Sequence, residues 1–375
     1  MSRNRLHLCF MVWGEPFLAA LASTTLPTLL SPNNLPTAAR NAEVVIHVYT
    51  DQASLTSAQR VFAPLEAFGA LHLHPFETTQ GKVETIATHA RPHRGASLKH
   101  EINVQSTHHL IELVLREDAA GIIALMDNNF LIADGTLTHG LEALKTGAHA
   151  YFLPTLRLTA EALDPAMWAH GVSARTLVKT FPRALHPTTR ACWATAAEFS
   201  SYPAQILWPV EKSGGEEESL CRAFFPHLFL FHPVPSCLDA VMTADYDLGL
   251  RAAGGPEHLA SPASSDEGLI CKLTPTDYAP VSGEKSPLSL GGLAHFLLAS
   301  TNHRHRELAA RPFRLVTGTV DDAAWRSCEA TSLNILDQAY ALAERALAEL
   351  PPDEPEVQAA RNAYLGSLDD FSRNG

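Results

Sequence analysis

Short apolar runs alternate along the chain with longer stretches in which apolar residues recur at helical spacing. The runs are rich in β-branched and aliphatic residues and are bounded by turn residues, which is typical of buried strands. They predict strands at residues 6–13, 44–50, 71–76, 122–126, 149–154 and 228–234. The longer stretches predict helices at residues 16–30, 55–68, 97–116, 137–146, 173–185, 322–350 and 355–372.

This order of elements predicts the fold class. Strands and helices alternate as far as residue 154, and parallel neighbours need crossover connections, so we expect an α/β protein with a mostly parallel central sheet flanked by helices. Residues 158–209 become mainly helical, and residues 254–285 are dense in Gly, Pro, Ser and Thr, which predicts a loop or lid. We divide the chain into a core at 1–253, a loop-rich lid or acceptor region at 254–320 and a C-terminal helical extension at 321–375.

Composition narrows the class of protein. The 375 residues are 46% hydrophobic, which supplies a sizeable core, and 40 acidic against 28 basic residues give a net charge of -12. That charge disfavours nucleic acid as a partner. Six cysteines without a C-x-x-C pair indicate reduced thiols. We interpret the apolar start as a first strand, and no run approaches the roughly 20 apolar residues of a membrane span, so we expect a cytoplasmic protein without a transmembrane segment.

The stretch IIALMDNNFLIADG, residues 122–135, contains the strongest candidate site. A buried strand ends at Asp127 and Asn129, and open α/β sheets bind ligands at the carboxyl ends of their strands. A carboxylate with an amide neighbour, completed by phosphate oxygens and water, suffices for Mg²⁺ or Mn²⁺. An ordinary turn of Asp and Asn is the alternative. Asp134, before Gly135, is favoured as a helix N-cap, and otherwise lies close to the metal.

The first two predicted strands end in residues that suit a nucleotide. Trp13 could cover a base or ribose, and Gly14 would allow the backbone to approach a ligand closely. Thr50 and Asp51 follow the second strand, and Asp51 could accept hydrogen bonds from a base or ribose. Because parallel strands end at the same sheet edge, we expect these four residues to bind the donor together. A sheet rim with turn residues explains them equally well.

Lys99 and Asn103 are one helical turn apart and share a helix face, so they could bind a diphosphate or the donor sugar. An exposed helix face is the alternative. Other nucleotide and hydrolase signatures are missing from the sequence: there is no G-x-S-x-G, no G-x-x-x-x-G-K-[ST] and no G-x-G-x-x-G. Serine hydrolases, P-loop NTPases and ordinary Rossmann dehydrogenases are therefore disfavoured.

Several motifs in order resemble a group of bacterial glycosyltransferase-like proteins with the A-type nucleotide-sugar transferase fold. The resemblance spans roughly the first 270 residues. The matching segments are FMVWGEPFLAAL with TLPTLLSPNNLP near the start, VYTD at 48–51, MDNNFLIADG at 126–135, LHP at 185–187, ILWPV at 206–210, FLFHP at 229–233, DYD at 245–247 and SSDE at 264–267.

The resemblance implies an Asp-x-Asp element that holds a divalent cation against a sugar diphosphate, with a histidine from a late element completing the coordination. On this chain these positions are Asp127, Asn129 and His232, with a hydrogen-bonded core histidine as the alternative for His232. The third position is Asn where the family has Asp, and Met126 and Ala133 also depart from the family pattern. Glu211 is a candidate catalytic base, with surface exposure as the alternative for this residue.

These observations predict a metal-dependent glycosyltransferase that moves a sugar from a nucleotide diphosphate sugar to a glycan or protein acceptor, with Mn²⁺ or Mg²⁺ as cofactor. The alternative from another class is a binding or regulatory protein that keeps the sheet and the nucleotide sugar but lacks turnover. A sugar nucleotidyltransferase is a weaker alternative, because the N-terminal region has no glycine-rich, basic nucleotide loop. Donor, acceptor and stereochemical outcome do not follow from the sequence.

Overall fold

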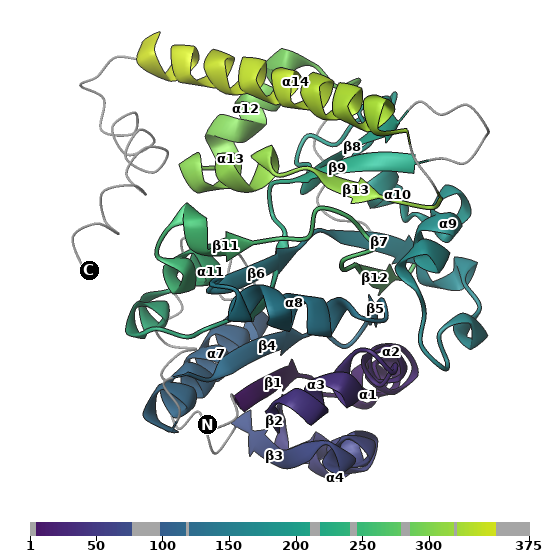
Figure 1. Ribbon diagram of the computed structural model, residues 1–375, viewed down its shortest axis with the longest axis vertical. Coiled ribbons are helices and arrows are strands. Elements are labelled where there is room, and N and C mark those ends of the chain that lie inside the picture. Colours follow the sequence, from purple (N-terminus) through teal and green to yellow (C-terminus); the bar gives the residue numbers. More distant parts are fainter. Residues whose placement is uncertain are drawn as a thin grey trace.

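The computed structural model describes residues 5–76, 98–117, 120–210, 218–240, 246–278, 286–318 and 321–349. Its centre is a seven-stranded sheet in the order β11-β6-β10-β4-β1-β2-β3 (Figure 1). Every neighbouring pair is parallel except the two pairs that β10 makes with β4 and β6. The strands are β1 Arg5–Met11, β2 Glu43–Thr50, β3 Gly69–Pro75, β4 Ile122–Met126, β6 Ala150–Leu153, β10 His227–Phe231 and β11 Leu259–Ala260.

Helices cover both faces of this sheet, and the alternation along β1 shows how. Leu6, Leu8 and Phe10 are fully buried in a core with α1, α3, α4 and α8, whereas Cys9 points into a core with α7 and α11. Strands buried on both faces read as continuous apolar runs, which is the pattern in the sequence. The helices are α1 Glu15–Ala20, α2 Leu26–Leu29, α3 Leu35–Asn41, α4 Leu55–Phe62, α7 Leu98–Glu117, α8 Thr136–Lys145 and α11 Tyr246–Ala253; a π-helical segment, Leu21–Thr25, joins α1 to α2.

Two three-stranded sheets extend the core. One has the order β5-β12-β7, with β5 Phe130–Ile132, β7 Thr155–Thr159 and β12 Ile270–Thr274. The other has the order β13-β9-β8, with β8 Gln205–Val210, β9 Glu218–Ala223 and β13 Phe313–Leu315. Helices α9 Ala174–Ala184 and α10 Pro187–Arg190 pack beside the first of these sheets. Helices α12 Leu290–Ser300, α13 His303–Ala310 and α14 Asp322–Glu349 pack on the second, and α14 lies at the end of the molecule opposite β1–β3 (Figure 1).

The predicted α/β class is confirmed: the central sheet is mostly parallel, and helices flank it. The predicted C-terminal helix is present as α14, whereas the helix predicted at 355–372 lies outside the described residues. Residues 158–209, expected to be mainly helical, also contribute the end of β7 and all but the last residue of β8. Residues 254–285, expected to be a loop or lid, form β11 and β12. These strands are short, and they depend on pairing with distant partners rather than on local sequence signals.

The three-part division of the chain stays a prediction, although residues 254–320 supply one strand to each of the three sheets. Within the described residues, no helix combines the length and apolarity that crossing a membrane requires. All six cysteines are free, and five of them are buried.

A row of histidines crosses one face of the central sheet. The rings of His7, His47 and His74 lie on three adjacent strands, with His7 Nδ1 3.1 Å from His47 Nε2 and His47 Nδ1 3.0 Å from His74 Nε2. Burial, reinforced by neighbouring histidines, lowers the pKa of His47 to about 2 and that of His74 to about 4. His47 and His74 are therefore neutral in the folded protein at neutral pH.

We expect this row to make the protein acid-sensitive. The unfolded chain protonates His47 near its ordinary pKa of 6.5, whereas the folded chain does not until much lower pH, so stability is lost as pH falls below about 6.5. His47→Gln should reduce the pH slope of the unfolding free energy by one proton, roughly 1.4 kcal/mol per pH unit. Urea unfolding at several pH values measures this slope. His170→Gln, at an exposed position, is the control, and an unchanged slope in His47→Gln would contradict the prediction.

Candidate functional site at the carboxyl edge of the sheet

Asp127 begins the turn that connects β4 of the central sheet to β5 of the β5-β12-β7 sheet. Thr25 holds this turn from the π-helical segment: its Oγ1 donates to the Asp127 carbonyl oxygen at 2.8 Å and accepts from the Phe130 backbone N–H at 3.0 Å. Asp127 Oδ1 accepts from the Asn128 backbone N–H at 2.7 Å. The side chain of Asp127 remains 34% exposed, so a ligand can reach it.

Lys272 of β12 forms an ion pair with Asp127 Oδ2. Burial raises the pKa of the Asp127 carboxyl, but the charge and hydrogen bond of Lys272, with the Asn128 N–H, outweigh burial and lower it. Asp127 is therefore a carboxylate at neutral pH. Lys272 was not predicted from the sequence, because it lies in the stretch expected to be a loop, and only the strand pairing brings it to Asp127.

Asn129 is fixed by backbone contacts in the same turn. Its Nδ2 donates to the Leu273 carbonyl oxygen at 2.6 Å, and its backbone carbonyl accepts from the Leu273 N–H at 2.9 Å. Its Oδ1 is buried and has no hydrogen-bond partner among the described residues. The amide thus joins β5 to β12 and offers at most one neutral oxygen to a ligand.

His232 lies away from Asp127, contrary to the predicted shared cation site. Strand β10 runs antiparallel to β4, and its register pairs Phe231 with Ile123, which places His232 beside the start of β4. Asp127 follows the end of β4, roughly 17 Å away at about 3.4 Å per residue. His232 Nδ1 lies 3.3 Å from the Gly121 carbonyl oxygen, at the amino edge of the sheet.

The histidine that does approach Asp127 is His227, at the beginning of β10. Its ring lies edge-on to Phe130 at 4.9 Å, its Nε2 is 3.3 Å from the Leu125 carbonyl oxygen, and it is close enough for the Asp127 charge to act on its pKa. Burial lowers the pKa of His227 to about 4, so the ring is neutral at neutral pH. The direction of β10, which the sequence pattern does not reveal, decides which end of the strand meets Asp127.

Asp134 does not cap α8, contrary to the predicted N-cap role. Gly135 occupies the N-cap position of α8, and both Asp134 carboxylate oxygens accept hydrogen bonds from Asn33, one from the backbone N–H and one from Nδ2, each at 2.8 Å. Asp134 therefore clamps the turn at residues 31–34 to the start of α8. The first turn of α8 has another acceptor instead, since Asn34 Oδ1 accepts from the Leu137 backbone N–H at 3.0 Å.

The ends of β1 and β2 meet at the same edge, as predicted. Gly14 has a φ of 82° and donates its N–H to Ser54 Oγ at 2.9 Å. Asp51 caps the short helix after β2 by accepting from the Ser54 N–H at 2.8 Å. Trp13 packs edge-on against Phe76 at 5.1 Å. The Thr50 side chain is fully buried, and its hydroxyl has no hydrogen-bond partner among the described residues.

The remaining predicted site residues are placed only in part. Asn103 is half-buried in α7, and its backbone carbonyl accepts from Thr107 Oγ1 at 2.9 Å. Lys99 belongs to the first turn of α7. Glu211, the candidate base, lies outside the described residues.

The donor set around Asp127 does not fit a divalent cation. Among the described residues, no three His, Cys, Asp or Glu side chains converge in a way that could hold a metal ion. The one carboxylate is already neutralised by the Lys272 ammonium, and the nearby His227 ring approaches a backbone carbonyl. A dication at Asp127 would have to lie beside a positive charge, which opposes its binding.

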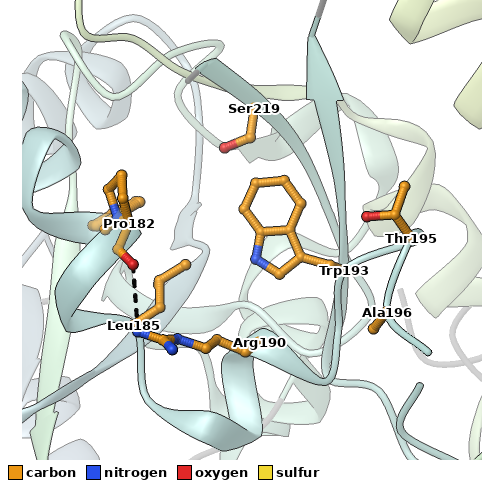
Figure 2. A pocket seen from close by; sticks show the side chains of 8 residues that line it. Pro182, Leu185, Arg190, Trp193, Thr195, Ala196 and Ser219 are labelled. Carbon is orange, nitrogen blue, oxygen red and sulfur yellow. Dashed lines mark hydrogen bonds between the residues drawn. The ribbon is translucent and has the colours of Figure 1, made fainter. Parts of the chain in front are cut away.

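A cavity of about 310 Å³ lies apart from this edge, between α9, α10 and β9 (Figure 2). Trp193 extends into it, and Arg190 Nη2 lies 3.4 Å from the Pro182 carbonyl oxygen on its wall. Phe181 and Leu185 on its wall belong to the core on the face of the β5-β12-β7 sheet opposite Lys272, and Trp193 packs against this core. None of the sequence-predicted site residues lines this cavity. The lining residues are Phe181, Pro182, Leu185, Arg190, Trp193, Thr195, Ala196 and Ser219.

Removing Lys272 should raise the pKa of the Asp127 carboxyl, because the ammonium that opposes the effect of burial is then lost. Carboxyl ¹³C NMR of aspartate-labelled Lys272→Met against pH measures this shift. Lys145→Met, which removes an exposed ammonium from α8, is the control and should leave Asp127 unchanged. An Asp127 titration that is the same in Lys272→Met and the unmodified protein would show that the ion pair is absent in solution.

Comparison with known proteins gives no match to a protein-family model and no match to a curated protein. Several solved structures show weak similarity, including the following two. Mouse xyloside xylosyltransferase 1, in its apo form, is 13% identical with a TM-score of 0.31 over 40% of this chain and 53% of its own, so the match spans about half of that protein. A mannosyltransferase from Pyrobaculum calidifontis in complex with GDP-Man and Mn²⁺ is 12% identical with a TM-score of 0.30, over 99% of this chain and 83% of its own.

Proposed function

We propose that the protein is a glycosyltransferase that transfers a sugar from a nucleotide diphosphate sugar to a glycan or protein acceptor. The observation that supports this most is the position of the Asp127–Lys272 pair at the carboxyl edge of a mostly parallel sheet, beside the ends of β1 and β2. Ligands of open α/β sheets bind at this edge. A partly exposed ion pair there offers both an acceptor for hydroxyl groups and a cation for phosphate.

The end of β1 gives the nucleotide a place to approach. The positive φ of Gly14 turns the chain sharply, and a Cβ built on Gly14 would meet no atom closer than 3.8 Å. Asp51 starts the next helix at the same edge. We assign these two strand ends to the nucleoside and the Asp127–Lys272 pair to the diphosphate and sugar, as in the arrangement that the sequence resemblance implies.

The transfer itself would be driven by charge neutralisation. Breaking the bond between the sugar and the diphosphate leaves negative charge on the leaving group, and a positioned cation lowers the barrier by stabilising that charge. Lys272 is positioned for this by Asp127. The acceptor hydroxyl must also lose its proton, and Glu211 stays our proposal for the base.

A non-catalytic nucleotide-sugar-binding protein is the second candidate. It is favoured by the amide of Asn129, which is committed to the Leu273 carbonyl where the family pattern has a carboxylate. The two functions differ in one measurable respect. Titration calorimetry with uridine and guanosine diphosphate sugars, with and without Mn²⁺, tests binding, and release of the nucleoside diphosphate in the presence of acceptors tests transfer. Binding without release would favour the second candidate, and no binding of any of these sugars would contradict both.

Gly14→Ala should weaken binding of the nucleotide sugar at least tenfold, because a side chain strains the positive φ on which the strand end depends. Gly147→Ala is a matched control. Gly147 also has a positive φ, 112°, and open space around its Cβ position, but it precedes β6 at the amino edge of the sheet. Both variants should lose on the order of 1 kcal/mol of stability. Equal affinities of the two variants for the nucleotide sugar would indicate that the nucleotide does not bind at the end of β1.

A further inference from the structure

Lys272 belongs to a row of side chains that crosses the β5-β12-β7 sheet. The register pairs Lys272 with Phe130 on one side and with Arg157 on the other. Paired residues on neighbouring strands point to the same face of a sheet. The alternate residues of the same strands, Leu131, Cys271 and Leu156, point into the core on the opposite face. Lys272 and Arg157 are therefore adjacent on the face that carries the contact with Asp127.

The two cations in this row are incompletely neutralised. Lys272 has one carboxylate partner, Asp127, and lies 5.7 Å from the centre of the Phe130 ring. Arg157 donates from Nη1 to Thr274 Oγ1 at 3.2 Å, and its guanidinium lies 4.9 Å over the Tyr278 ring. Among the described residues, no carboxylate forms a salt bridge with Arg157. Two positive charges against one negative charge leave this group with a net charge of one positive unit.

This net positive charge favours binding of an anion over binding of a metal cation. A guanidinium held flat by an aromatic ring keeps its N–H groups in a fixed fork, which matches two phosphate oxygens. A lysine ammonium adds a point charge beside it. Diphosphate carries the negative charge and the oxygen pairs that such a fork and point charge bind.

We propose that Lys272 and Arg157 bind the diphosphate of the donor directly, in place of a divalent cation. The proposal rests on the proposed function, and it changes the role of Asp127: the carboxylate positions Lys272 rather than ligating a metal. Donor binding is then independent of Mn²⁺ and Mg²⁺. This explains why the residues around Asp127 do not fit a metal site: Lys272 already supplies the positive charge that a metal ion would bring.

The sharpest test uses Asp127→Asn, because the two mechanisms predict opposite results. If Lys272 and Arg157 bind the diphosphate, Asp127→Asn removes a negative charge beside the phosphates, while the amide oxygen can still accept a hydrogen bond from Lys272 and position it. The affinity for uridine or guanosine diphosphate in EDTA should therefore stay the same or rise. If a metal mediates binding, Asp127→Asn removes a ligand, and the affinity should fall steeply. Titration calorimetry with both nucleoside diphosphates, in EDTA and in Mn²⁺, measures the difference.

The cations are tested by removing each charge in turn. Arg157→Met and Lys272→Met should each weaken nucleoside diphosphate binding about tenfold or more, as the loss of a charge-assisted hydrogen bond implies. Arg157→Lys and Lys272→Arg keep the charge and should retain more affinity than the methionine variants. Arg306→Met is a matched control. Arg306 belongs to α13, away from this sheet, and its guanidinium also lies 4.9 Å over a tyrosine ring, that of Tyr340. Thermal unfolding of each variant separates lost binding from lost folding.

The outcomes distinguish this proposal from the proposed function. Binding that persists in EDTA, survives Asp127→Asn and falls in the two methionine variants supports the proposal. Binding that requires Mn²⁺, is lost in Asp127→Asn and is unaffected in folded Arg157→Met and Lys272→Met overturns it and leaves the proposed function intact. No binding of uridine or guanosine diphosphate under either condition overturns both.

Discussion

The turn from β4 into β5 is the constraint on which the rest of the site depends. In three residues the chain leaves the central sheet and enters the β5-β12-β7 sheet, and the hydroxyl of Thr25 holds the turn at both ends. Because β5 pairs with β12, this crossing brings Lys272 to Asp127 from 145 positions further along the chain. The ion pair therefore joins the two sheets at the point where both reach the carboxyl edge.

The same turn explains why the site is rich in charge but poor in metal ligands. The Asn129 side chain donates to the Leu273 carbonyl oxygen, and the Asp134 carboxylate accepts from Asn33. Neither side chain forms a hydrogen bond with Asp127. The positive charges come instead from the second sheet, where Lys272 and Arg157 are neighbours in register. A phosphate-binding edge can be built from such cations as well as from a bound metal, since both supply positive charge close to phosphate oxygens.

The two faces of the central sheet are packed with different kinds of side chain. The face covered by α1, α3, α4 and α8 is aliphatic and aromatic, whereas the face under α7 contains the histidine row of His7, His47 and His74. The central ring, His47, contacts an imidazole on each side, and as a neutral ring it can donate to one and accept from the other. Protonation removes its acceptor, so acid disrupts this row.

The sequence by itself determined most elements of the first 154 residues and their largely parallel arrangement, because strands buried on both faces and amphipathic helices have strong local periodicity. The short helix α3 and the short strand β5 were not predicted. It also determined that Asp127 and Gly14 would stand at strand ends. Only the tertiary structure decided which distant residues meet them. The antiparallel direction of β10 brings His227 to Asp127 in place of His232, and the pairing of β12 brings Lys272 and Arg157. Strand direction and non-local register leave no mark on local periodicity, because they arise from contacts between segments far apart in the chain.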